Sequence, residues 1–240
     1  MTDSQNKSSV SPTGHTSPTI STRTEIDSFL AKMTGAAVTT SGSSGRLIFG
    51  IDATGSRQPT WDIACQLQAE MFRETAAIGG LSVKLVYYRG TSECRASRWV
   101  SQPEHLSSLM ERIDCRMGHT QIGKVLAHAK RETQILKVQV LVFVGDAMEE
   151  NADELARDAG ELGRLGVPAF VFQEGYDPQV ERVFREIARI TRGAYCRFNP
   201  GAARQLGELL KAVAIFATGG MAALAARQDA TAIKLLGQLK

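Results

Sequence analysis

The feature that most constrains the fold is a regular alternation of apolar, β-rich runs with segments of helical periodicity. The apolar runs fall at about 46–52, 81–88, 94–100, 137–145, 168–173 and 194–198. Segments with helical spacing fall between them or after the last, at about 59–77, 103–113, 120–133, 151–165, 178–191 and 203–217. The run 138–144 is apolar on both faces, as a central parallel strand covered by helices must be. The alternation therefore predicts an α/β domain.

One connection in this pattern is too short for a crossover helix. Residues 87–93 join the second and third runs, so these two strands are expected to form a hairpin. The third run carries Arg95 and Arg98, which suits an antiparallel strand at the edge of a sheet. The other connections predict a doubly wound, mostly parallel, Rossmann-like sheet of six strands with helices on both faces. Its expected order is 3-2-1-4-5-6, which makes the first and fourth strands neighbours.

Composition excludes several classes of protein. The chain has 240 residues, 43% hydrophobic and 22% charged, which fits one α/β domain with modest extensions. The formal net charge of +3 is spread along the chain and does not imply a nucleic-acid partner. The longest uncharged run, 212–226, is too short to span a membrane. The four cysteines are scattered without a metal-binding spacing, so reduced thiols and a cytoplasmic location are expected.

The ends of the chain differ from its middle. Eleven of the first twenty-two residues are Ser or Thr, and no basic start followed by an apolar run marks a secretory signal. Residues 1–23 are therefore expected to be a disordered tail, residues 24–217 the domain, and residues 218–240 a helical extension. Leu235, Leu236 and Leu239 would share one helical face. That face either docks back onto the domain or supports self-association.

Oxygen-bearing side chains gather where two of the predicted strands end. The first strand runs into Asp52-Ala53-Thr54-Gly55-Ser56, which places an acid and two hydroxyls at alternate positions. Asp146 ends the fourth strand, and in a doubly wound sheet the carboxyl ends of these two strands flank the ligand-binding crevice. Only oxygen donors are present, with no His or Cys beside them. Such donors are typical of a site for a hard divalent cation rather than for a nucleophile.

These motifs, together with Gly118-His119-Thr120 at the start of a predicted helix, resemble the von Willebrand factor type A (VWA) family, which includes the integrin inserted domains. The resemblance covers about residues 46–217 and implies that family's metal-ion-dependent adhesion site, or MIDAS. It implies Mg²⁺, with Mn²⁺ or Ca²⁺ as alternatives, surrounded by Asp52, Thr54, Ser56, Thr120 and Asp146. Thr54 stands where Ser is commoner, and His119 stands where Gly is usual.

The function implied by the resemblance is protein binding without catalysis, as a scaffold or adaptor. An acidic side chain of a partner protein would complete the coordination of the ion. The enzyme alternative is a Mg²⁺-dependent haloacid-dehalogenase-type phosphohydrolase, in which Asp52 would be the nucleophile and Val144-Gly145-Asp146 part of the magnesium motif. Against it, Thr54 stands where that class usually places an acid–base Asp, two more strands follow Asp146, and Thr120 has no role. The stretch from Gly50 to Ser56 also lacks the lysine of a phosphate-binding P-loop.

Some of these residues also have ordinary structural interpretations. Thr120 is a natural N-cap for the helix that follows it. Glu149, Glu150 and Asp153 are expected to be a solvated helix start, favoured by the helix dipole, with a position at the rim of the site as the alternative. Trp61 is expected to anchor the core.

Overall fold

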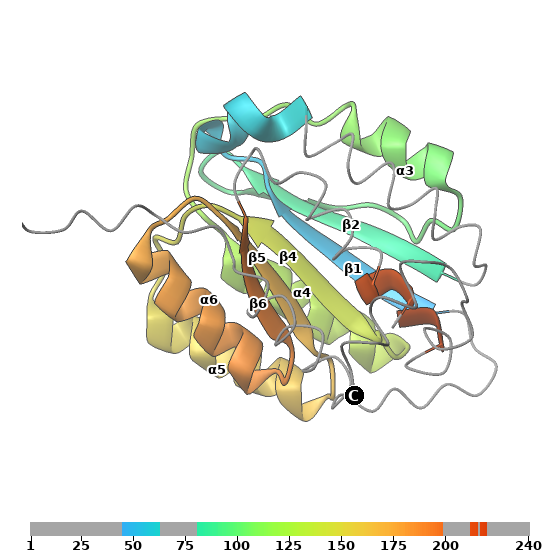
Figure 1. Ribbon diagram of the computed structural model, residues 1–240. Helices are drawn as coiled ribbons and strands as arrows, with labels where there is room; N and C mark the ends of the chain where they lie inside the picture. The colour runs from blue at the N-terminus through green and yellow to red at the C-terminus, as the bar shows by residue number, and fades with distance from the viewer. Residues whose placement is uncertain (1–44, 63–80, 199–211, 216, 220–240) are drawn as a thin grey trace, which may run out of the picture.

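The computed structural model describes residues 45–62, 81–198, 212–215 and 217–219 (Figure 1). Its elements are β1 (Gly45–Asp52), η1 (Gly55–Thr60, a 3-10 helix), β2 (Leu81–Arg89), β3 (Glu93–Ala96), α3 (Pro103–Met110), α4 (Ile122–Ile135), β4 (Val140–Gly145), α5 (Ala152–Arg164), β5 (Ala169–Glu174), α6 (Pro178–Ile190) and β6 (Ala194–Phe198). The expected N-terminal tail, and the leucine face of the expected C-terminal extension, lie outside the described residues.

The strands form one sheet in the order β3-β2-β1-β4-β5-β6, as predicted. Every neighbouring pair is parallel except β2 and β3, which form the expected antiparallel hairpin at the edge. Gly90 sits in the hairpin turn with φ of 61°, a left-handed conformation that glycine adopts without steric cost. The register pairs Ile51 with Val144, so β1 and β4 end side by side.

Each face of the sheet has its own apolar core because successive strand residues point to opposite sides. Leu47, Phe49 and Ile51 of β1 pack on the side of α3 and of the helical residues 212–215, together with Trp61, which confirms its place in the core. Ile48 packs on the other side, where α4, α5 and α6 contribute their apolar faces. Figure 1 shows the sheet between these two layers. The burial of β4 on both faces is the reason for its unbroken apolar run.

Several boundaries differ from those predicted. The third strand ends at Ala96 rather than at residue 100, although Val100 still pairs with Val83 in an isolated bridge. Pro59, the first residue of the predicted helix 59–77, lies inside η1, and α-helical residues follow at 61–62, where this described range ends. Within the described ranges, no helix has the length and apolar character needed to cross a membrane.

Candidate metal centre

The side chain of Asp52 stabilises the first loop of the site by accepting a hydrogen bond from within that loop. β1 delivers Asp52 fully buried at its carboxyl end. Asp52 Oδ1 accepts a hydrogen bond from the backbone N of Thr54 at 2.7 Å, and Oδ2 accepts one from the Tyr88 hydroxyl at 2.9 Å. The hydroxyls of Thr54 and Ser56 lie 3.1 Å apart. The three oxygen-bearing side chains predicted from the Asp-x-Thr-x-Ser motif are therefore gathered in one loop.

The second carboxylate comes from the neighbouring strand. Asp146 follows β4 immediately, and a Cβ added to the preceding Gly145 would lie 3.5 Å from Asp52 Cβ. Asp146 Oδ1 is buried and accepts no hydrogen bond from any described residue. A buried carboxylate oxygen without a donor is unusual, and an ion is one of its standard explanations. Asp52 and Asp146 thus lie near each other at the carboxyl ends of β1 and β4, a place called the crevice below, and the charge of Asp146 acts on Asp52.

Thr120 lies in the loop before α4 and is 5% exposed. Its hydroxyl accepts a hydrogen bond from the backbone N of Glu149 at 2.9 Å, and its own backbone N donates to Glu149 Oε2 at 3.1 Å. The N-cap of α4 is Gln121, so the prediction that Thr120 caps this helix was wrong. A hydroxyl oxygen has two lone pairs, so Thr120 keeps one for a cation.

The start of α4 is held by a residue that sequence reasoning assigned elsewhere. The carboxylate of Glu150 accepts hydrogen bonds from the backbone N of Ile122 at 2.9 Å and of Gly123 at 2.8 Å. Helix α5 has its own cap, Asn151, which accepts from the backbone of the two residues that follow Ala152. Glu149 and Glu150 are therefore not simply a solvated start of α5. They connect the loop of Asp146 to the loop of Thr120.

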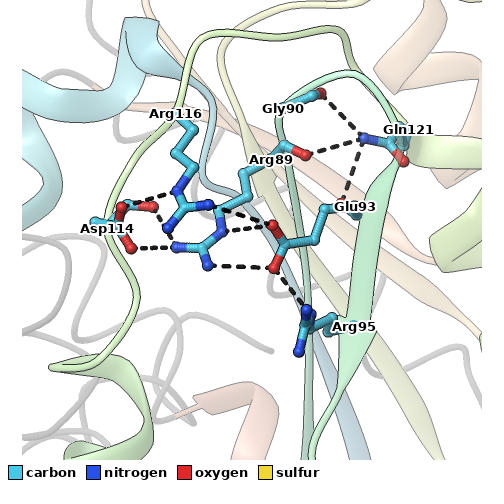
Figure 2. Close-up of polar contacts among 7 residues, drawn as sticks. All are labelled: Arg89, Gly90, Glu93, Arg95, Asp114, Arg116 and Gln121. Atoms are coloured by element: carbon cyan, nitrogen blue, oxygen red, sulfur yellow. Dashed lines mark hydrogen bonds and ion pairs between the residues drawn. The ribbon is translucent and has the colours of Figure 1, made fainter.

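A cluster of ion pairs fixes the segment that leads to Thr120 (Figure 2). The half-buried Glu93 contacts Arg89 at 3.1 Å, Arg95 at 2.9 Å and Arg116 at 3.9 Å. Asp114 pairs with Arg89 and, at 2.9 Å, with Arg116. The hydrogen bond from Arg116, together with that from Arg89, lowers the pKa of Asp114 to about 2. Ion pairs thereby connect the β2–β3 hairpin to the segment 114–116.

Backbone contacts bring the same segment against the first loop. The N–H of Arg116 donates to the carbonyl of Ala53 at 3.0 Å, and the N–H of His119 donates to the carbonyl of Gly90 at 3.2 Å. Gly118 packs directly on Gly90, where a side chain would collide with backbone atoms. This contact explains the glycine before His119. The segment that leads to Thr120 therefore contacts the first loop, and Glu149 and Glu150 link it to the loop of Asp146.

The pKa of Asp52 indicates that negative charge is poorly compensated at this site. Burial raises the pKa of Asp52 to about 6, and the negative charge of Asp146 acts in the same direction. The hydrogen bonds from Thr54 and Tyr88 act the other way, but they come from uncharged groups. A divalent cation would favour the ionised form of both carboxylates.

Sequence reasoning missed one charged residue at this crevice, Arg57. Its side chain is fully buried and forms an ion pair with Glu174 at the carboxyl end of β5. Glu174 also accepts a hydrogen bond from the Thr60 hydroxyl at 3.1 Å. The sequence signal was an arginine directly after the motif, but its partner lies more than a hundred residues away.

The donor set fits a hard cation such as Mg²⁺, which takes oxygen ligands and keeps several waters. The first loop supplies a carboxylate and two hydroxyls, Asp146 supplies a second carboxylate that interacts with Asp52, and one oxygen of Asp146 lacks a donor. In the described part of the chain, no group of three or more His, Cys, Asp or Glu side chains is arranged so that it could hold a metal ion. Metal binding here would therefore depend on the two carboxylates.

Comparison with known proteins identifies the fold. No family model and no curated protein matches the sequence. Among solved structures, the chain is similar to a von Willebrand factor type A protein from Catenulispora acidiphila (20% identity, TM-score 0.58), covering 70% of this chain and 42% of that one. It is also similar to the SpRpn10 VWA domain (14% identity, TM-score 0.56), covering 69% of this chain and 94% of that domain.

A third similar structure is the vWF domain of the type V pili tip protein Mfa5 from Porphyromonas gingivalis. Its identity is 10% and its TM-score 0.56, over 77% of this chain and 98% of that domain. The strand order, the single antiparallel edge strand and these neighbours together show that this chain has the von Willebrand factor type A fold.

Proposed function

We propose that this chain is a metal-dependent protein-binding module of the VWA type. Asp52, Thr54, Ser56, Thr120 and Asp146 hold Mg²⁺, or alternatively Mn²⁺ or Ca²⁺, and an acidic side chain of a partner protein completes the coordination. The single observation that carries the proposal is the convergence of Asp52 and Asp146 at one crevice, with a buried oxygen of Asp146 that no described residue satisfies. The VWA fold supports an interaction role, and a cytoplasmic location remains a prediction.

The surroundings of the crevice suit a protein ligand. Met117 is 84% exposed, and its side chain lies on Gly55, within the first loop. Arg116 and His119 beside it are exposed as well. A flexible thioether adapts to different apolar partners, and a metal ion held by the two carboxylates would attract an acidic group. The favoured ligand is therefore an acidic side chain flanked by apolar residues.

The phosphohydrolase alternative gains no specific support. Asp52 is fully buried, and each of its oxygens already accepts a hydrogen bond. The exposed residues of the first loop carry no second acid.

Calorimetric titration with Mg²⁺ and Mn²⁺ tests the metal site. Wild type should bind one ion, Asp146→Asn should lose most of the affinity, and Glu154→Gln, at an exposed position on α5, should behave as wild type. Affinity capture with the purified chain, in Mg²⁺ and in EDTA, then tests the binding function. Equal affinity of wild type and Asp146→Asn for the metal would overturn the assignment of the site.

A further inference from the structure

The buried ion pair of Arg57 and Glu174 joins the loop after β1 to the end of β5, on either side of the strand that precedes Asp146. Arg57 leaves the loop after β1, whereas Glu174 ends β5, and β4 lies between those two strands. The Arg57 side chain therefore has to pass the carboxyl end of β4, where Asp146 follows Gly145. Its side chain is 0% exposed and that of Glu174 is 9% exposed, so both charges are largely removed from water.

The electrostatics agree with this placement. Burial lowers the pKa of the Arg57 guanidinium, and the negative charges of Asp146 and Asp52 act to raise it. An arginine remains protonated near neutral pH even when it is buried. Arg57 therefore supplies a permanent positive charge next to both carboxylates of the crevice.

Arg57 partly neutralises the carboxylates of the crevice. Asp52, Asp146 and Glu174 contribute three negative charges, and Arg57 contributes one positive charge, which leaves a net charge of minus two. A divalent cation balances that charge. Without Arg57 the same crevice would carry three uncompensated negative charges, which is costly at buried positions.

Resting on the proposed function, we propose that Arg57 is a fixed internal counter-cation of the metal crevice. It lets the domain fold when no ion is bound, and it limits the affinity for the ion that does bind. A positive charge beside the two carboxylates repels the divalent ion, so its removal should strengthen metal binding while it destabilises the metal-free protein. Arg57 is thus a positioning and affinity-setting residue rather than a ligand.

The test uses the full chain with Arg57→Met, which removes the charge at similar length, and Arg57→Lys, which keeps it. In calorimetric titrations Arg57→Met should bind Mn²⁺ about tenfold more tightly than wild type, and Arg57→Lys should stay close to wild type. The double variant Arg57→Met/Glu174→Gln restores the net charge and should return to the wild-type affinity.

A second measurement decides the role of Arg57 even without a metal. In EDTA, urea unfolding of wild type, Arg57→Met, Asp52→Asn and the combined variant Arg57→Met/Asp52→Asn forms a thermodynamic cycle. Arg57→Met should lower the free energy of unfolding, and adding Asp52→Asn should restore part of the loss. The coupling between the two substitutions should be about tenfold in the unfolding equilibrium constant. Zero coupling, with Mn²⁺ affinity unchanged in Arg57→Met, would overturn the inference. Absence of Mn²⁺ binding in every variant would instead count against the proposed function, while the coupling would still decide the role of Arg57.

Discussion

Glu132 of α4 and Asp52 of β1 are two poorly exposed carboxylates with different hydrogen-bond donors. Glu132 accepts hydrogen bonds from Lys84 Nζ at 2.6 Å and Trp99 Nε1 at 2.8 Å, with Arg46 also within 3.4 Å. Asp52 accepts hydrogen bonds from uncharged groups of Thr54 and Tyr88.

The pKa values follow this difference in partners. Burial acts to raise the pKa of Glu132, but the hydrogen bonds from Lys84 and Trp99 outweigh it, so the pKa lies below its ordinary value. Burial and Asp146 bring the pKa of Asp52 up to about 6. The carboxylate of Glu132 is thus satisfied by the folded chain, whereas the crevice of Asp52 remains short of positive charge. This contrast separates a structural ion cluster from a candidate cation site.

The largest predicted effect is on the pH dependence of the metal-free protein. The folded-state pKa of Asp52 lies above the unfolded value, so its contribution to stability is present at low pH and is lost as pH rises from about 4 to above 6. Between pH 4 and 7 the loss should be about 2–3 kcal/mol. Urea unfolding in EDTA should show Asp52→Asn gaining that much relative to wild type over this range. If the difference in free energy of unfolding between Asp52→Asn and wild type did not vary with pH, the pKa of Asp52 would not be raised and the contrast with Glu132 would fail.

Glu132 should respond to pH in the opposite direction. Its folded pKa is lowered, so its stabilising contribution is present above the unfolded pKa of about 4.5 and is lost as pH falls through the folded value. Glu132→Gln should therefore destabilise the protein by about 1–2 kcal/mol at pH 7, because the charged hydrogen bonds from Lys84 and Trp99 weaken. The same unfolding series at pH 3 should find little difference between the variant and wild type.

Adding Mg²⁺ should reduce the difference between the two carboxylates. At ten times its dissociation constant, an ion that binds only the folded state stabilises it by about 1.4 kcal/mol, or a shift in Tm of about 3–6 °C. The shift should grow from pH 5 to pH 7, because the ion competes with the proton on Asp52. Glu132→Gln should keep the shift and Asp146→Asn should lose it. An equal shift in all three proteins would place the ion elsewhere.

The smallest predicted effect concerns Thr120. Its hydroxyl accepts the backbone N–H of Glu149, so Thr120→Val should cost about 1 kcal/mol by leaving that amide without an acceptor. Thr120→Ser keeps the oxygen and serves as the matched control. If Thr120 is also a ligand, Thr120→Val should weaken capture of a protein partner in Mg²⁺ more than it weakens ion binding. Capture that matches the Thr120→Ser control would limit Thr120 to the hydrogen bond.

Much of the site was predictable because its parts lie at fixed places in the fold. Asp52, Thr54 and Ser56 are close in sequence, and their loop is shaped by local hydrogen bonds. The position of Asp146 beside them follows from the strand order, which the lengths of the connections already indicated. Whether an ion binds there remains a prediction.

The contacts between loops were not predictable. Composition indicated that Glu149 and Glu150 would start α5, as acids commonly do. In the structure Asn151 caps α5. The carboxylates of Glu149 and Glu150 instead accept hydrogen bonds from backbone N–H groups 27 to 29 positions earlier in the chain. A side chain's sequence neighbours do not reveal which distant backbone amides will need an acceptor.

The sequence by itself determined the alternation of strands and helices, the antiparallel hairpin, the order of the sheet and the first loop of the site. These features follow from hydrophobic periodicity, connection length and short-range turn chemistry. Only the tertiary structure decided that Arg57 pairs with Glu174, that Glu150 holds the start of α4, and that Asp146 keeps a buried oxygen without a donor. The reason is physical: the energy of a buried charge depends on every group packed around it, and those groups come together only when distant parts of the chain do.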